Sequence, residues 1–139
     1  MGTQHAIVAQ IQEKKADYVL ALKGNHSTLL AQVKNWFNQA RAKDFEGVGL
    51  SYDQRIETGH YRREKRRVWA IPVEAVGGLH QQQQWSGLQS IIMVERVRCL
   101  WNKTTYESQY YLSSLPPDAQ LNAPVIRQYW GIENQLYWN

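Results

Sequence analysis

The order of apolar and polar residues divides the chain into an α/β beginning, a β-rich middle and a helical end. Residues 3–15 have the spacing of a short amphipathic helix. Residues 18–22 form an almost continuous apolar run, which is typical of a strand covered on both faces. A second helix is predicted from a cap at Ser27 or Thr28 to about residue 41, with an apolar side formed by Leu29, Leu30, Val33, Trp36 and Phe37. This succession predicts an α/β arrangement.

The middle of the chain has the pattern of β-strands. Four strands are predicted, over residues 52–58, 61–71, 89–101 and 104–113. Asn102-Lys103 is the predicted tight turn between the last two, because Asn tolerates the positive φ that hairpin turns require. The segments expected to be buried are residues 68–71 and 91–94, which are the most apolar of the region.

The end of the chain begins where Pro116-Pro117-Asp118 interrupts the β pattern. Asp118 is predicted to start or cap a final helical region. Pro124 is predicted to begin a further helix at its first turn, running from Val125 toward the end. Gly131 inside that helix costs about 1 kcal/mol relative to Ala, which suggests close approach by another element or a ligand.

Glu133 has unusual surroundings for a surface acid. On a helix it lies on a mainly aromatic stripe with Tyr129, Trp130 and Tyr137. Burying an unpaired carboxylate costs several kcal/mol, so this setting predicts a bound cation or other acids nearby. The plainer alternative is a rim carboxylate paired with Arg127 or Lys103.

Composition and charge narrow the class of protein. The 139 residues are enough for one domain with a core, and 16 basic against 12 acidic residues give a net charge of +4, compatible with a nucleic-acid partner. Cys99 is the sole cysteine, which excludes an internal disulfide and a zinc site of several cysteines. No apolar run approaches the roughly 20 residues that span a bilayer, and the start lacks a signal peptide's features. We therefore predict a cytoplasmic protein without a membrane segment.

The densest charge cluster, residues 62–67, sets one acid, Glu64, among the five cations Arg62, Arg63, Lys65, Arg66 and Arg67. On a strand its even-numbered and odd-numbered members face opposite ways. At this charge neither face is expected to be buried, so the strand or its hairpin is predicted to project into solvent or onto a polyanion. One interpretation is contact with DNA phosphates, and the other is a solvated edge strand whose charges deter aggregation.

The sequence gives little evidence for a histidine metal site, a nucleophile elbow or a phosphate-binding loop. His60 lies near Glu57 and Glu64, but further ligands at the spacing of a metal site are missing, and ordinary hydrogen bonding in a turn is expected. Ser113-Ser114 lacks the glycine frame of a nucleophile elbow. Lys23-Gly24-Asn25 lacks the spacing of a phosphate-binding loop.

Seven segments in order resemble the H-repeat-associated group of bacterial insertion-sequence transposases: residues 1–4, 17–25, 59–64, 85–88, 94–96, 111–116 and 130–134. The last of them is Trp130-Gly131-Ile132-Glu133-Asn134. Each segment alone is a weak signal, whereas seven in the right order indicate kinship. The resemblance covers the chain almost from end to end.

This resemblance implies a catalytic domain of the DDE, RNase H-like kind, in which three acids surround two divalent metal ions, usually Mg²⁺. It places the family's glutamate at Glu133, which is therefore expected to be catalytic and to bind Mg²⁺. The family's two aspartates fall upstream of Met1. None of the chain's own aspartates takes their place, namely Asp17, Asp44, Asp53 and Asp118. The position before Trp130 is usually basic in the family and is Tyr129 here, which weakens an expected contact with substrate phosphate.

The resemblance also divides the chain into parts of one partial DDE domain. Residues 1–45 would be the second half of an RNase H-like core, residues 46–116 a β-rich insertion, and residues 117–139 the helix that carries Glu133. Missing strands of the core would leave an open edge at the strand over residues 18–22. Insertions in related transposases help to bind DNA, which favours the DNA interpretation of Arg62, Arg63, Lys65, Arg66 and Arg67.

The resemblance thus predicts a truncated transposase with DNA as its partner and metal-dependent DNA cleavage and strand transfer as its family activity. One glutamate does not hold two Mg²⁺ ions, so the chain alone is predicted to be inactive. The alternatives are a non-catalytic DNA-binding fragment that modulates a full-length transposase, an inert remnant, and a full-length enzyme whose start is assigned too late.

Overall fold

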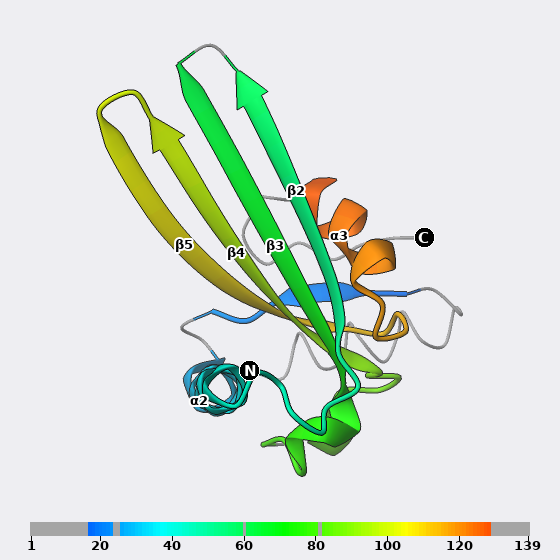
Figure 1. The fold of residues 1–139 in the computed structure, drawn as a ribbon. Coiled ribbons are helices and arrows are strands. Elements are labelled where there is room, and N and C mark those ends of the chain that lie inside the picture. The colour runs from blue at the N-terminus through cyan, green and yellow to red at the C-terminus, as the bar shows by residue number, and fades with distance from the viewer. Residues whose placement is uncertain (1–16, 24–25, 60, 81, 129–139) are drawn as a thin grey trace.

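The computed structural model describes residues 17–23, 26–59, 61–80 and 82–128. They form one antiparallel sheet of five strands in the order β1-β5-β4-β3-β2, with helix α2 against one face and helix α3 against the other (Figure 1). The strands are β1 Val19–Ala21, β2 Ser51–Gly59, β3 Arg62–Pro72, β4 Ser90–Leu100 and β5 Lys103–Ser113. The helices are α2 Ser27–Ala42 and α3 Ala119–Gln128, with short 3₁₀ turns at Val73–Val76 and Gln82–Gln84. The predicted mixture of helices and sheet is confirmed.

The strand β1 is an edge strand of the sheet. It is buried on both faces, as its apolar run predicted. Leu20 packs toward α2, whereas Val19 and Ala21 pack toward α3. Next to the strand, the Tyr18 amide donates to Ser114 Oγ at 2.8 Å, and the Ser114 amide donates to the Tyr18 carbonyl at 3.0 Å. Among the described strands β1 pairs with β5 alone, so its outer edge has no partner strand there.

The four predicted strands of the middle region are confirmed, with ends within two residues of those expected. The predicted turn at Asn102-Lys103 is wrong by one residue, because Leu100 pairs with Lys103 and leaves Trp101 and Asn102 in the turn. The positive φ expected of Asn102 is found in the other hairpin, at Tyr61, where φ is 58°. Both segments predicted to be buried, residues 68–71 and 91–94, are buried throughout.

Helix α2 has the apolar side that its spacing predicted, but not the predicted cap. Leu29, Val33 and Phe37 are buried against the sheet. The N-cap is His26, without a side-chain hydrogen bond to the helix, so the expectation of a cap at Ser27 or Thr28 is wrong. The His26 amide donates to the Lys23 carbonyl at 2.8 Å, and this turn starts the helix one residue early. The helix predicted over residues 3–15 lies outside the described residues.

Helix α3 begins at the cap that the sequence predicted. Asp118 Oδ1 accepts hydrogen bonds from the amides of Gln120 at 2.9 Å and Leu121 at 3.2 Å. Pro124 lies inside this helix, so the prediction that it begins a separate helix is wrong. The capping contact has already started the helix before Pro124, and Ala119 and Ile126 bury its inner side against the sheet.

Removing the cap of α3 is expected to have a modest effect. Asp118→Ala loses both amide contacts at the first turn and is expected to lower the free energy of unfolding by about 1 kcal/mol. Asp118→Asn keeps a capping oxygen and is expected to retain most of that stability. Urea denaturation of both variants measures the difference, and equal losses would show that the cap is not what stabilises the first turn.

The three inner strands change character halfway along their length. Near the helices they are apolar and closely packed, and Ile71, Ile91 and Leu112 are each 0% exposed. Their other halves carry charged residues and extend, with β2, beyond both helices (Figure 1). We call these extending parts, residues 54–59, 61–67 and 95–108, the projecting hairpins. Burial of apolar area stabilises the half of the sheet near the helices, and polar contacts predominate in the other half.

Candidate nucleic-acid interface

The projecting hairpins present two faces with different charges, because side chains alternate along each strand. Arg62, Glu64 and Arg66 lie on the α3 side, while Arg63, Lys65 and Arg67 lie on the α2 side. The contacts of the neighbouring residues confirm this alternation: Arg66 shares Glu57 with Arg127 of α3, and Arg67 shares Glu95 with Arg41 of α2. The charge cluster is therefore not one surface but two.

The charges of β3 do not protect a sheet edge. β3 pairs with β2 along one side and with β4 along the other, over its whole charged half. The interpretation of residues 62–67 as a solvated edge strand is therefore wrong. The edge strand of this part of the sheet is β2.

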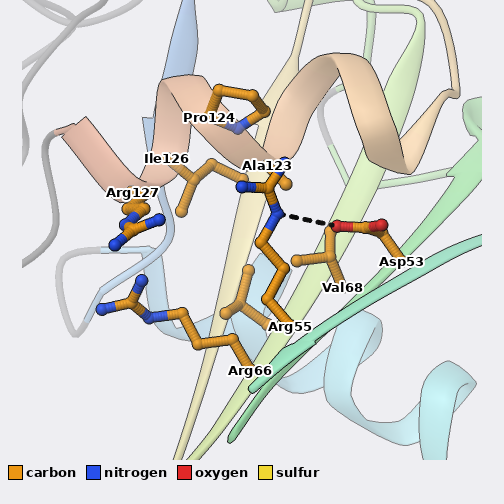
Figure 2. Close-up of a pocket in the computed structure, with 9 residues that line it drawn as sticks. Asp53, Arg55, Arg66, Val68, Ala123, Pro124, Ile126 and Arg127 are labelled. Atoms are coloured by element: carbon orange, nitrogen blue, oxygen red, sulfur yellow. Dashed lines mark ion pairs between the residues drawn. The ribbon is translucent and has the colours of Figure 1, made fainter. Parts of the chain in front are cut away.

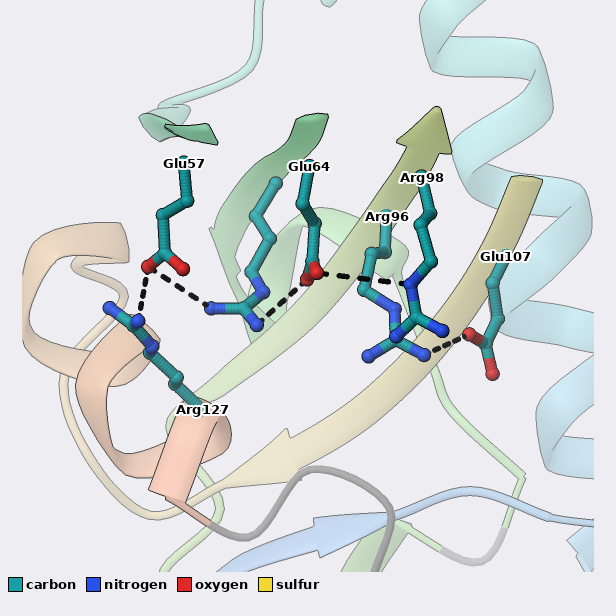
Figure 3. Close-up of polar contacts among 7 residues, drawn as sticks. Glu57, Glu64, Arg96, Arg98, Glu107 and Arg127 are labelled. Atoms are coloured by element: carbon teal, nitrogen blue, oxygen red, sulfur yellow. Dashed lines mark hydrogen bonds and ion pairs between the residues drawn. The ribbon is translucent and has the colours of Figure 1, made fainter. Parts of the chain in front are cut away.

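On the α3 side, acids and arginines from four elements form one chain of ion pairs (Figure 3). Arg127 of α3 pairs with Glu57 of β2, whose Oε1 also lies 3.8 Å from Arg66 Nη1. Arg66 Nη2 lies 2.7 Å from Glu64 Oε1, and Arg98 Nε of β4 lies 3.8 Å from Glu64 Oε2. The chain of contacts thus ties three neighbouring strands to the helix.

Glu64 corrects the expectation that neither face of the cluster is buried. Its side chain is 5% exposed, and that of Arg66 is 19% exposed. Because arginines from its own strand and from the next strand neutralise it, Glu64 is buried as a paired charge. Most charges on the α3 side are therefore engaged with one another rather than free for a partner.

A second ion pair joins β4 to β5 on the same side. Arg96 Nη2 donates to Glu107 Oε2 at 2.7 Å (Figure 3). Close to this pair, burial raises the pKa of the Tyr111 phenol; Glu107 reinforces the shift and Arg96 opposes it. The Tyr111 hydroxyl donates a hydrogen bond to Gln109 Oε1.

On the α2 side, the paired charges stop near the helix. Arg41 of α2 and Arg67 share Glu95, at 3.3 Å and 3.5 Å. The Arg41 guanidinium also lies 5.0 Å from the centre of the Trp69 ring, a favourable cation–π distance. Nearby, burial raises the pKa of the Tyr110 phenol, which Arg41 lowers and Glu95 raises to a smaller extent.

Nearer the hairpin tips, three of the five predicted DNA-contacting residues have no ion-pair partner among the described residues. They are Arg62, Arg63 and Lys65, of which the first two are exposed and the third is partly exposed. Arg66 and Arg67, by contrast, are the two that already pair with acids. The structure therefore separates the predicted cluster into available and engaged cations.

Exposed aromatic residues at the hairpin tips were not among the predicted site residues. Tyr61, Trp101 and Tyr106 are 71%, 80% and 75% exposed. Arg62 pairs with Leu100, so Tyr61 and Trp101 each stand one residue beyond a pair that joins the two hairpins. The sequence placed Trp101 at the end of a predicted strand, and only the register of β4 and β5 puts it in the turn, where a large aromatic residue has no core to enter. Aromatic rings beside free cations are typical of surfaces that bind nucleic acids.

Comparison with known proteins identifies relatives of this chain. Over 99% of its length it is 30% identical to the "Putative transposase YncI" of Escherichia coli O157:H7 and 27% identical to the "H repeat-associated putative transposase YhhI" of E. coli strain K12. It is also 33% identical, over 85% of its length, to an "Uncharacterized protein in dhlA 3'region" of Xanthobacter autotrophicus. The relatives named as transposases support a transposase family for this chain. No family model and no solved structure matches the chain.

The chain spans little more than a third of the length of these relatives. It covers 38% of the Xanthobacter protein, 35% of YncI and 36% of YhhI. The activity, substrate and partners of the whole proteins are therefore matters for a proposal. Among the residues that the structure describes, no helix is long and apolar enough to cross a membrane.

The catalytic residue that the transposase resemblance predicts, Glu133, lies outside the described residues, as does His60. Within the described ranges no group of three His, Cys, Asp or Glu side chains is placed to hold a metal ion. The assignment of Glu133 as a catalytic, Mg²⁺-binding residue stays a prediction. So does the division of the chain at residues 45 and 116, although β1 and the β-rich region share one sheet.

Proposed function

We propose that this chain is part of a DDE-type transposase and that its projecting hairpins bind the phosphate backbone of DNA. The observation that carries the proposal is a set of cations that have no ion-pair partner in the described part of the chain, Arg62, Arg63 and Lys65, on strands that extend beyond both helices. A guanidinium or ammonium group that no acid neutralises is available to a phosphate, and it releases counterions from DNA on binding.

The positions of these cations suit a duplex better than a small ligand. They lie on both faces of a ribbon of four strands, and Tyr61 and Trp101 stand at its tips. Phosphate contacts of this kind fix a protein's position on DNA and carry little sequence information. We therefore assign the hairpins to holding DNA, and not to choosing the sequence that is cut.

For the catalytic part, we propose that Glu133 is the glutamate of a DDE site in an RNase H-like domain, completed by two aspartates that these 139 residues do not contain. Carboxylate oxygens are the ligands that Mg²⁺ prefers, and two such ions would activate the attacking oxygen and stabilise the leaving one. A lone glutamate cannot hold two ions. The family support for this assignment comes from the relatives named as transposases.

The 139-residue chain is accordingly expected to neither nick nor join DNA on its own. Purified chain incubated with supercoiled plasmid and Mg²⁺ or Mn²⁺ should leave the plasmid intact, because one carboxylate provides too few ligands for the metals. Glu133→Gln is the matched control. Nicking by the chain that Glu133→Gln abolishes would refute the proposed inactivity.

A second function uses the same cations without catalysis. A chain that binds DNA but does not cut it would compete with a longer transposase of the family for the same DNA. Adding the chain to a transposition assay of such a relative is then expected to reduce product, and the Arg63→Gln, Lys65→Gln variant should reduce it less. No inhibition by a chain that demonstrably binds the DNA would exclude this role.

A further inference from the structure

A cavity of about 370 Å³ lies between α3 and the sheet, at the base of the projecting hairpins (Figure 2). Its volume is within the range of roughly 300–1,000 Å³ that is typical of small-ligand sites. Three arginines from three different elements line it, namely Arg55 of β2, Arg66 of β3 and Arg127 of α3. Asp53 is the one acid among the described lining residues.

The arginines keep hydrogen-bond donors that the protein does not use. Arg55 Nε lies 3.7 Å from Asp53 Oδ2, too far for a good hydrogen bond. Arg66 Nε and Nη1 have no hydrogen-bond partner among the described residues, but both atoms are enclosed. Arg55 and Arg127, whose side chains are 56% and 45% exposed, are the arginines that an anionic group in the cavity can reach. Since Glu57 and Glu64 already offset part of the charge, the site suits one anionic group rather than many.

The rest of the cavity wall is apolar. Val68, Val94 and Ile126 lie behind it and are 5%, 1% and 4% exposed, so the accessible apolar surface comes mainly from Ala123 and Pro124 of α3. A bare inorganic anion makes no use of such a surface. A planar or apolar body attached to the anion would cover it, and Asp53 would accept a hydrogen bond from an N–H group on that body.

We propose that this cavity binds one nucleotide, with its phosphate at Arg55 and Arg127, beside the charge of Arg66, and its base on the apolar wall. The source would be a nucleotide of a DNA strand held by the hairpins, which rests on the proposed function, or a free mononucleotide with the same chemistry. The site shares no residue with the three free cations of the hairpins, because Arg55 and Arg66 lie nearer the base of the hairpins and Arg127 lies on α3.

Isothermal titration calorimetry of the 139-residue chain tests the proposal with deoxyadenosine 5′-monophosphate, deoxyadenosine and inorganic phosphate as separate ligands. The nucleotide is expected to bind at least about tenfold more tightly than deoxyadenosine or phosphate, because only the nucleotide contacts both the arginines and the apolar wall. The double variant Arg55→Gln, Arg127→Gln removes two charges whose side chains are 56% and 45% exposed, so the fold is expected to survive. Its affinity for the nucleotide is expected to fall about tenfold or more.

Two further variants show whether the nucleotide binds in the cavity or is only attracted by the positive charge of the protein. Ala123→Leu fills the cavity without changing charge and is expected to weaken nucleotide binding by a similar factor. Arg63→Gln removes a cation on the opposite face of the sheet and is expected to change the affinity less than about twofold. Equal weakening by Arg63→Gln, or full binding by Ala123→Leu, would overturn the proposal.

The same binding experiments show whether the bound nucleotide belongs to a DNA strand or is free. They also show which of the two proposals, the cavity or the hairpins, has failed. Displacement of the nucleotide by a short single-stranded oligonucleotide identifies a DNA strand as the source, and its absence identifies a free nucleotide. Duplex binding that depends on Arg63 and Lys65, without any nucleotide binding, would overturn the cavity proposal alone. Nucleotide binding without duplex binding would instead overturn the function proposed for the hairpins.

Discussion

Glu64→Ala is expected to lower the free energy of unfolding by about 3 kcal/mol, because it leaves Arg66 and Arg98 close together without the acid between them. Glu64 is 5% exposed, whereas Arg98 is 39% exposed and stays partly solvated. The expected loss therefore lies near the lower end of about 3–5 kcal/mol found when one partner of a buried ion pair is removed.

Glu107→Ala is the matched control for this prediction. Glu107 also pairs with an arginine at 2.7 Å, but its side chain is 46% exposed, so the expected loss is below about 1 kcal/mol. Urea denaturation followed by circular dichroism measures both variants. Similar losses for Glu64→Ala and Glu107→Ala would contradict the claim that burial of Glu64 makes its pairing important.

A double-mutant cycle isolates the contact between Glu64 and Arg66. Replacing both residues with methionine removes the charges together, and such an exchange is often close to neutral. We expect the double variant to be more stable than Glu64→Met alone, because the largely buried Arg66 guanidinium is removed with its acid and only the more exposed Arg98 is left without a partner. If the double variant loses more unfolding free energy than the two single variants lose together, the stabilisation comes from other contacts of the network.

Arg63→Gln with Lys65→Gln is expected to weaken binding to a duplex of arbitrary sequence by about 30-fold to 150-fold, from two lost phosphate contacts of about 1–1.5 kcal/mol each. Neither residue has an ion-pair partner among the described residues, so their removal leaves no buried acid unpaired. The variant should therefore unfold at the same urea concentration as the original chain.

The matched control for this charge change is Lys34→Gln with Lys43→Gln. Both lysines are exposed, on α2 and at its C-terminal cap, away from the hairpin tips. Fluorescence anisotropy with a labelled duplex at low salt measures both double variants. If the control weakens binding as much as the hairpin variant does, affinity follows net charge and not the hairpins.

Local patterns predicted the elements well because each is set by its own residues. The apolar run over residues 18–22 can be stable only where both faces are covered, and β1 is covered by both helices. The buried segments 68–71 and 91–94 pair directly across β3 and β4, as two apolar runs in one sheet should. Asp118 caps α3 because its carboxylate reaches the first free amides, which depends on nothing distant.

The errors arose where two local preferences competed. Pro124 is favourable in the first turn of a helix, but Asp118 had already started α3. Asn102 suits a turn, and it is in one, yet the register of β4 and β5 moves that turn one residue toward Trp101. A single residue type indicates that a turn is near, whereas cross-strand pairing decides where it lies.

The site was predictable in part for a different reason. Spacing along β3 predicted which charges face together, but not that Glu57 and Arg98 from neighbouring strands, and Arg127 from α3, would meet them. Those partners lie far away in sequence, so the burial of Glu64 and the availability of Arg63 could not be predicted from residues 62–67. The cavity beside α3 depends on the same distant packing.

The central claim, that the projecting hairpins hold DNA through their free cations, is tested most directly by the salt dependence of duplex binding. Each phosphate contact contributes about 0.9 to the slope of the logarithm of the binding constant against the logarithm of salt concentration. The Arg63→Gln, Lys65→Gln chain is therefore predicted to show a slope smaller by about 1.8 than the original chain, while the Lys34→Gln, Lys43→Gln chain keeps the original slope. Parallel lines for the original and the hairpin variant would contradict the claim.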